Sequence, residues 1–318
     1  MTIDIATQPS PGFEHEALFY AGDGGFVART SAFIRDGLVD DEPILVVVGA
    51  SKIDLLRSEL GEDADRVRFE DMSELGRNPA WIIPAWADFV AEHGGSGRRF
   101  RGIGEPVTPD RGPEELVECE RHEALLNLAF AEGPAWSLAC PYDVTALPVA
   151  VLAVAGRNHP TVFDGSERHP SPMYPGLDAF SAPFEDQLPE PKGETRESTF
   201  SDVRSVRDFV ERVGSELGAG ARTDDLLLAV SEVATNSILY GGGGGSIRMW
   251  RDGAVVMCEI QDNGQIADPL IGRRRPDAAR PSGFGLWLAN QVCDLVQIRS
   301  FEGGSIIRLR VAVPTSYG

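Results

Sequence analysis

The sequence predicts two α/β domains: a three-layer sandwich around a mainly parallel sheet, followed by a two-layer sandwich with a mixed, mostly antiparallel sheet. Two observations predict this division. Residues 181–198 are rich in Pro, Glu and Ser without an apolar period, which is typical of a linker, and they follow a proline-rich stretch at 169–176. Helix and strand patterns alternate before the linker, whereas two helices precede paired strands after it. We expect a disordered N-terminus at 1–12, a first domain at 13–180 and a second at 199–315.

In the first domain, the run at 43–49 is apolar throughout, as in a strand covered on both faces. Ser51 is placed to cap the next helix, and Pro113 and Gly133 mark the ends of a longer one. The expected strands are 15–20, 43–49, 67–72, 101–107 and 135–143, and the expected helices are 30–38, 51–60, one within 79–93, and 113–133.

In the second domain, apolar residues recur at helical spacing over 202–218. Thr223 is placed to cap a second helix, 223–241, whose first turn carries two acidic residues that the helix dipole favours. Strands are expected at 246–251, 255–262, 296–300 and 305–313, and a helix at 284–294.

Composition narrows the class of protein. The chain has 318 residues, of which 42% are apolar and 25% charged, as in soluble globular proteins, and no apolar run is long enough to span a membrane. The N-terminus lacks a secretory signal pattern, so we expect a cytoplasmic protein. A net charge of −20 disfavours direct nucleic-acid binding and suits a partner with a basic face. Nearly all basic residues are arginine, which indicates a bacterium with GC-rich DNA.

The four cysteines are widely spaced and form no C-x-x-C pair. We therefore expect neither a zinc-binding spacing nor a disulfide framework, and interpret the cysteines as small buried residues. The four are Cys119, Cys140, Cys258 and Cys293. A thiol sensor is the alternative interpretation for Cys119 or Cys140.

Three short motifs in the second domain carry the chemistry. Glu232 and Asn236 lie one helical turn apart, and such a pair suits a hydrated Mg²⁺ and a hydroxyl near a phosphate. Asp262 ends a strand, where it can accept from an exocyclic amine, and Gly264 lets a flat base approach. A G-x-G within 282–286 opens a helix whose N–H groups can bind phosphate. Taken singly, the three motifs also have plainer interpretations: a solvated helix stripe for the first, a turn for the second and an ordinary loop for the third.

In this order and spacing the motifs resemble the GHKL ATPase superfamily, within it the anti-sigma-factor serine kinases, whose S-E-x-x-T-N box stands at 231–236. The resemblance implies a Bergerat-type fold with one pocket for ATP and Mg²⁺ beneath a lid. It implies Glu232 as general base, Asn236 as Mg²⁺ ligand and Asp262 on adenine N6. The other ATP-binding positions implied are Gly264, Gly283, Phe284, Gly285, Leu286, Ser305 and Arg275, with Arg273, Arg274 and Arg280 also in the lid.

The sequence departs from the family pattern at three points. Ile266 replaces the second glycine of D-x-G-x-G, the first helix box ends in Tyr240-Gly241 instead of His-Gly, and five glycines follow at 241–245. We expect ATP binding to survive these changes, whereas turnover is left open. All five histidines lie in the first domain, so a histidine autokinase is not expected.

Blocks within residues 13–165 resemble the MEDS domain, a sensory module of bacterial regulators related to the RecA-like fold. No P-loop pattern is present, so no ATP hydrolysis is expected here, and Lys52 is interpreted as a surface residue. Glu118 and His122 are spaced for a metal pair but lack further ligands. A pocket for a small-molecule signal, or simple core hydrogen bonding, is expected from polar residues His15, Glu105, Glu118, Glu120, His122, Cys140, Tyr142 and Asp143.

Together these resemblances imply a bacterial anti-sigma regulatory factor. The partners implied are a sigma factor and/or a STAS-type anti-anti-sigma protein phosphorylated on Ser or Thr, and a homodimer is allowed. The main alternative is a non-catalytic ATP-binding switch that regulates by sequestration. A sensor without any nucleotide is the third alternative.

Overall fold

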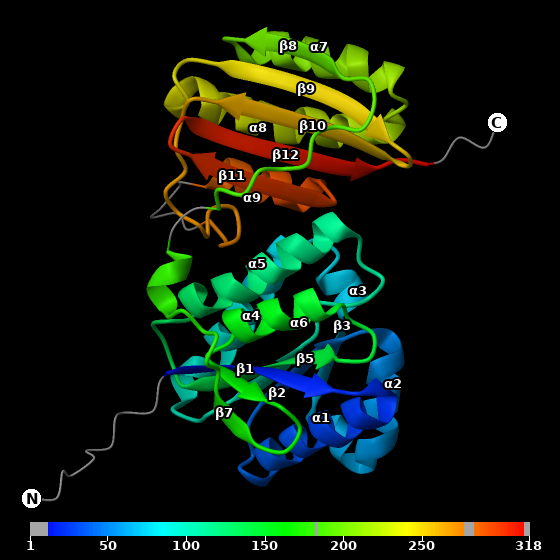
Figure 1. The fold of residues 1–318 in the computed structure, drawn as a ribbon, viewed down its shortest axis with the longest axis vertical. Coiled ribbons are helices and arrows are strands. Elements are labelled where there is room, and N and C mark those ends of the chain that lie inside the picture. Colours follow the sequence, from blue (N-terminus) through cyan, green and yellow to red (C-terminus); the bar gives the residue numbers. More distant parts are fainter. Residues whose placement is uncertain (1–11, 182–183, 277–282, 315–318) are drawn as a thin grey trace, which may run out of the picture. The chain divides into compact units, whose positions relative to one another are not determined.

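The computed structural model describes residues 12–181, 184–276 and 283–314 of the chain (Figure 1). Its residues form two compact units. The first comprises the chain up to Leu75 together with Ala85–Gly176, and the second comprises Gly76–Pro84 together with the chain from Leu177 onward. Within the described residues, no helix is both long and apolar enough to cross a membrane.

The first unit contains a seven-stranded sheet in the order β3-β2-β4-β5-β1-β6-β7. All neighbouring strands run parallel except β6 and β7, so the predicted mainly parallel sheet is confirmed. The strands are β1 (Phe13–Tyr20), β2 (Ile44–Val48), β3 (Arg68–Asp71), β4 (Arg101–Gly104), β5 (Trp136–Asp143), β6 (Thr161–Phe163) and β7 (Arg168–Pro170). The helices are α1 (Gly22–Val39), α2 (Ala50–Leu60), α3 (Met72–Leu75), α4 (Ile82–His93), α5 (Pro113–Ala129) and α6 (Val149–Asn158).

Helices cover both faces of this sheet, with α1 and α2 on one side and α4, α5 and α6 on the other (Figure 1). Successive side chains of a strand point to opposite faces. Val46 and Val48 of β2 therefore share a core with Phe26 and Ile34 of α1 and Leu56 of α2. Burial on both faces explains the unbroken apolar run of β2.

Several local expectations in the first unit are wrong. Ser51 is the second residue of α2 and does not cap it; Gly49 stands at the cap position without a side-chain hydrogen bond. Helix α5 ends at Ala129, before the expected Gly133. The elements α6, β6 and β7 were not expected, since the alternation appeared complete at β5 and the later strands have only three residues each.

The second unit contains a five-stranded sheet in the order β11-β12-β10-β9-β8, with every neighbouring pair antiparallel. Strand β8 begins at Arg196, inside the expected linker. Thr223 is the first residue of α8 and not its cap, which is Arg222. The strands are β8 (Arg196–Phe200), β9 (Gly245–Asp252), β10 (Val255–Asp262), β11 (Leu295–Phe301) and β12 (Gly304–Ala312), and the helices are α7 (Val203–Glu216), α8 (Thr223–Tyr240) and α9 (Phe284–Val292).

The three helices of the second unit cover one face of its sheet (Figure 1). Val210 of α7, Val230 of α8 and Ala289 of α9 are fully buried against inward side chains of the sheet such as Cys258. On the face away from the helices, Glu259 of β10 is paired by arginines from both neighbouring strands, Arg248 of β9 and Arg308 of β12. The sheet therefore has an apolar and a charged face.

Candidate nucleotide-binding site

Two helices of the second unit bring together the first group of predicted site residues. A Cβ atom built on Gly285 of α9 would lie 2.9 Å from Oε2 of Glu232 and 3.3 Å from Nδ2 of Asn236. Glycine at 285 therefore allows the start of α9 to approach the polar stripe of α8 closely. Both polar side chains are partly buried, and neither forms a hydrogen bond or ion pair with another described residue. Their oxygen atoms remain available as ligands.

The first turn of α9 provides hydrogen-bond donors beside this pair. Gly283 precedes the helix with φ of 88°, a left-handed conformation that glycine adopts without strain, and no side chain caps the helix. The first N–H groups of such a helix have no intrahelical acceptor, and they carry the positive end of the helix dipole. The start of α9 is therefore suited to bind an anion next to Glu232 and Asn236.

Asp262, at the end of β10, lies at the centre of the second group. Its Oδ2 accepts a hydrogen bond of 2.6 Å from Ser237 of α8. Its Oδ1 accepts from the hydroxyl of Ser305 on β12 at 2.9 Å and from the backbone N–H of Gly264 at 2.8 Å. The side chain is buried, and the register of β10 and β12 places Asp262 opposite Ser305. Three elements thus hold this carboxylate in one orientation.

Ser237 was missed by sequence reasoning, although it directly follows Asn236. It is fully buried, and its hydroxyl also lies 3.2 Å from the carbonyl oxygen of Val233. A serine in the middle of an apolar helix face was the available signal, because such a residue needs a hydrogen-bond partner.

The remaining predicted residues do not all lie beside these two groups. Leu286 is 2% exposed and packs in the core, so only its backbone faces the helix start. Phe284 is 51% exposed. Arg273 is buried, whereas Arg274 and Arg275 are exposed on the segment after β10. Arg280 and Ser282 lie outside the described residues.

The structure also shows where the residues that depart from the family pattern lie. Ile266 packs at the edge of the core, and its N–H donates to the hydroxyl of Ser300 on β11 at 2.9 Å. Tyr240, at the end of α8, is 77% exposed. The carbonyl of Gly241 accepts a hydrogen bond from the N–H of Asn263, which ties the end of α8 to the turn after β10. The segment leaving Asp262 is therefore anchored at both Asn263 and Ile266.

In the first unit, the interpretation of Lys52 as a surface residue is wrong. Its ammonium group lies 2.6 Å from Oε1 of Glu105, and its side chain is only 20% exposed. Tyr20 donates a hydrogen bond of 2.6 Å to the same carboxylate. Burial raises the pKa of the Glu105 carboxyl, and the charge of Lys52 opposes that rise. These groups gather at the carboxyl ends of β1 and β4, where α/β sheets commonly bind ligands.

The other candidate signal-binding residues separate into distinct places. His15 and Cys140 lie together in the interior with Glu123 and His159, which sequence reasoning did not select. Asp143 accepts hydrogen bonds from Thr145 at the end of β5. Glu118 and His122 are both buried on α5, and neither belongs to the group of metal-capable side chains found among the described residues.

Comparison with known proteins agrees with this division. Residues 14–160 match the MEthanogen/methylotroph, DcmR Sensory domain (MEDS) family, and residues 197–311 match the histidine kinase-like ATPase domain family. The chain thus joins a MEDS domain to a histidine kinase-like ATPase domain, as the motifs predicted, and the second family implies ATP binding. No curated protein matches the chain.

Two solved structures are similar to parts of the chain. The RsbU and RsbW domains of Rv1364c from Mycobacterium tuberculosis are 19% identical with a TM-score of 0.30, over 38% of this chain and 32% of that one. The histidine kinase AdeS from Acinetobacter baumannii is 16% identical with a TM-score of 0.24, over 37% of this chain and 68% of that one. This chain therefore covers less than a third of the length of the first.

Proposed function

We propose that the second unit binds ATP with Mg²⁺ and transfers phosphate to a serine or threonine of a regulatory partner. The proposal is supported chiefly by one observation. Glu232 and Asn236 stand without described partners beside Gly285, where the first turn of α9 offers unpaired N–H groups. A carboxylate, a carboxamide and a helix start in contact are the groups that a metal-bound phosphate chain requires.

Each residue has a defined part in this proposal. Asn236 would hold Mg²⁺ through its amide oxygen, and the ion, when bound, would supply positive charge beside the transferred phosphoryl group. The N–H groups at Gly285 and its neighbours donate to phosphate oxygens. Glu232 accepts the proton of the attacking hydroxyl. Asp262, held by Ser237 and Ser305, accepts from the exocyclic amine of adenine.

The partner class rests on the resemblance of the box at 231–236 to anti-sigma-factor serine kinases. It is a sigma factor or a STAS-type anti-anti-sigma protein. The net charge of −20 favours a partner with a basic face. The MEDS domain, on this proposal, receives a small-molecule signal in the cytoplasm, with the carboxyl ends of β1 and β4, where Lys52 and Glu105 pair, as the candidate place.

A test of the kinase proposal is to incubate the full chain with labelled ATP and a partner co-purified from the native host. Glu232→Gln should reduce phosphate transfer by about 10²- to 10⁴-fold while ATP binding stays near the wild-type level. Glu211→Gln, an exposed position on α7, is the matched control and should transfer normally. Equal transfer by Glu232→Gln and the wild type would remove Glu232 from its role.

One observation favours a second candidate, an ATP-dependent switch that regulates by sequestration alone. Ile266 stands where the related kinases have a glycine, and its hydrogen bond to Ser300 anchors the segment that a closing lid would have to move. On this reading the partner is captured in the presence of ATP without becoming phosphorylated. Capture without transfer by the wild-type chain would select this candidate over the kinase.

A further inference from the structure

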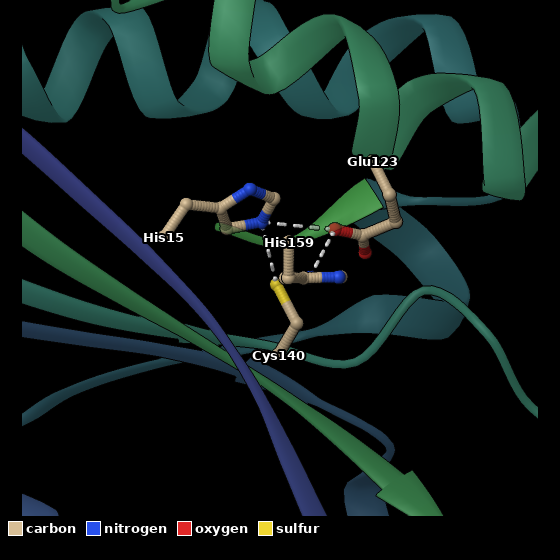
Figure 2. A group of neighbouring side chains, drawn as sticks. All are labelled: His15, Glu123, Cys140 and His159. Atoms are coloured by element: carbon tan, nitrogen blue, oxygen red, sulfur yellow. Dashed lines mark hydrogen bonds and ion pairs between the residues drawn. The ribbon is translucent and has the colours of Figure 1, made fainter. Parts of the chain in front are cut away.

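Four side chains meet in the interior of the first unit (Figure 2). His15 comes from β1, Glu123 from α5, Cys140 from β5, and His159 from the position directly after α6. One ligand atom from each lies within 4.8 Å of the other three, and all four residues are at most 1% exposed. The MEDS family match does not assign them a role.

The protonation of His15 follows from its neighbour Asn127. The amide nitrogen of Asn127 donates to the carbonyl oxygens of Asn158 at 2.7 Å and Ala124 at 3.2 Å, so its Oδ1 must face His15. His15 Nδ1 lies 3.1 Å from that oxygen and therefore carries the proton. The Nε2 atom of neutral His15 then presents a lone pair to the cluster.

His159 is oriented in the same way. Its Nδ1 lies 2.8 Å from the carbonyl oxygen of Ala155, which can only accept, so Nδ1 carries the proton. Its Nε2 lies 3.3 Å from Oε2 of Glu123. Backbone or amide oxygens that hold the outer nitrogen of a histidine, leaving the inner one to bind, are typical of metal sites.

The result is a buried cluster of electron-rich atoms that face one another. His15 Nε2 lies 3.2 Å from Glu123 Oε2 and 3.3 Å from Cys140 Sγ. Neither His159 Nε2 nor Glu123 Oε1 has a hydrogen-bond partner within the described part of the chain. Buried polar atoms left in this state require a partner.

We propose that these four residues bind one zinc ion. Zinc takes a tetrahedral set of nitrogen, oxygen and sulfur ligands, whose bond lengths imply ligand–ligand separations of about 3.3 Å between N and O and about 3.6 Å between N and S. The two N–O separations of 3.2 and 3.3 Å and the N–S separation of 3.3 Å fit this geometry. Four protein ligands fill the coordination sphere, so the site is structural and closed to substrate.

The charges of the four side chains also fit a zinc ion. Binding releases the thiol proton of Cys140 to solvent as the Zn–S bond forms. The thiolate and the carboxylate of Glu123 then cancel the two positive charges of the ion. A neutral site of this kind is compatible with complete burial.

The test measures metal in the full chain. Protein purified from a zinc-supplemented culture and dialysed should contain one zinc ion per chain by mass spectrometry of the metal. Cys140→Ser and His159→Gln should lose it, whereas Cys119→Ser, which alters a buried cysteine on α5 outside the cluster, should retain it. Stripping zinc with a chelator should lower the unfolding temperature of the wild-type chain, and added zinc should restore it.

Cobalt substitution keeps the test decisive if a variant folds poorly. Co²⁺ added to the stripped wild-type chain should give a thiolate-to-cobalt charge-transfer band together with tetrahedral d–d absorption. The band should be absent from Cys140→Ser and present in Cys119→Ser. Asn127→Leu, which removes the partner of His15, should weaken Co²⁺ affinity by about 10- to 100-fold. A folded wild-type chain that takes up neither zinc nor cobalt would overturn the proposal, as would a full band in Cys140→Ser.

Discussion

Replacing Asp262 with asparagine separates its structural part from its proposed contact with adenine. In the variant, the retained oxygen accepts from Ser305 and Gly264, and the new amide donates to the hydroxyl of Ser237. That hydroxyl turns its own proton to the carbonyl of Val233, 3.2 Å away. Every group keeps a partner, so the cost is the difference between charged and neutral hydrogen bonds, about 1 kcal/mol of unfolding free energy.

The substitution should weaken adenine binding more than it lowers the stability of the fold. Its exocyclic amine donates to a carboxylate in the wild type, whereas in Asp262→Asn it faces a weaker acceptor or a second donor. We expect ATP binding to weaken by about 2–3 kcal/mol, which is roughly 30- to 150-fold in dissociation constant. Titration calorimetry with a non-hydrolysable ATP analogue measures the affinity, and thermal unfolding measures the stability.

A nucleotide with inosine in place of adenosine sharpens the comparison, because its base has a carbonyl where adenine has the amine. The wild type should prefer the adenine nucleotide, and Asp262→Asn should lose that preference, since its amide can donate to the carbonyl. Asp252→Asn, an exposed position at the end of β9, should behave as the wild type. A folded Asp262→Asn that binds the ATP analogue with unchanged affinity would refute the base contact.

Two further predictions concern other contacts. Gly285→Ala places a Cβ atom 2.9 Å from Oε2 and 3.0 Å from Cβ of Glu232. The carboxylate can turn away, but the Cβ contact displaces the start of α9, so ATP affinity should fall by about tenfold. Gly303→Ala, which meets open space, should leave the same titration unchanged. Lys52→Met leaves the carboxylate of Glu105 buried without its cation, so the unfolding free energy measured in urea should fall by about 3 kcal/mol. The double variant with Glu105→Gln removes the unpaired charge and should recover most of that loss. No recovery would show that the loss of this ion pair is not the cause.

The placements that the sequence predicted around the candidate site are local ones. Glu232 and Asn236 share a helix face because of their spacing, and the glycines at 283 and 285 identify a helix start from composition alone. Asp262 was selected, but its partner Ser237 was not. The hydrogen bond between them depends on how α8 packs on β10, and spacing along the chain does not encode that packing.

The buried cluster of the first unit shows the same limit more strongly. Its members are separated by up to 144 positions (159 − 15), and the order of the strands together with the packing of α5 and α6 on the sheet brings them together. The cysteine pattern predicted no zinc site, because short spacings identify only those sites whose ligands lie on one loop or hairpin. Lys52 was misplaced for a related reason: its partner Glu105 follows a different strand.

The position of β1 within its sheet has a consequence for synthesis of the chain. This strand lies between β5 and β6, and Phe13 is paired with Trp136. During translation the first strand therefore leaves the ribosome long before either neighbour exists. Contacts so distant in sequence slow folding, and an unpaired strand meanwhile exposes its edges to other chains. We expect the yield of native protein to rise at lower growth temperature or with chaperones that shield nascent chains.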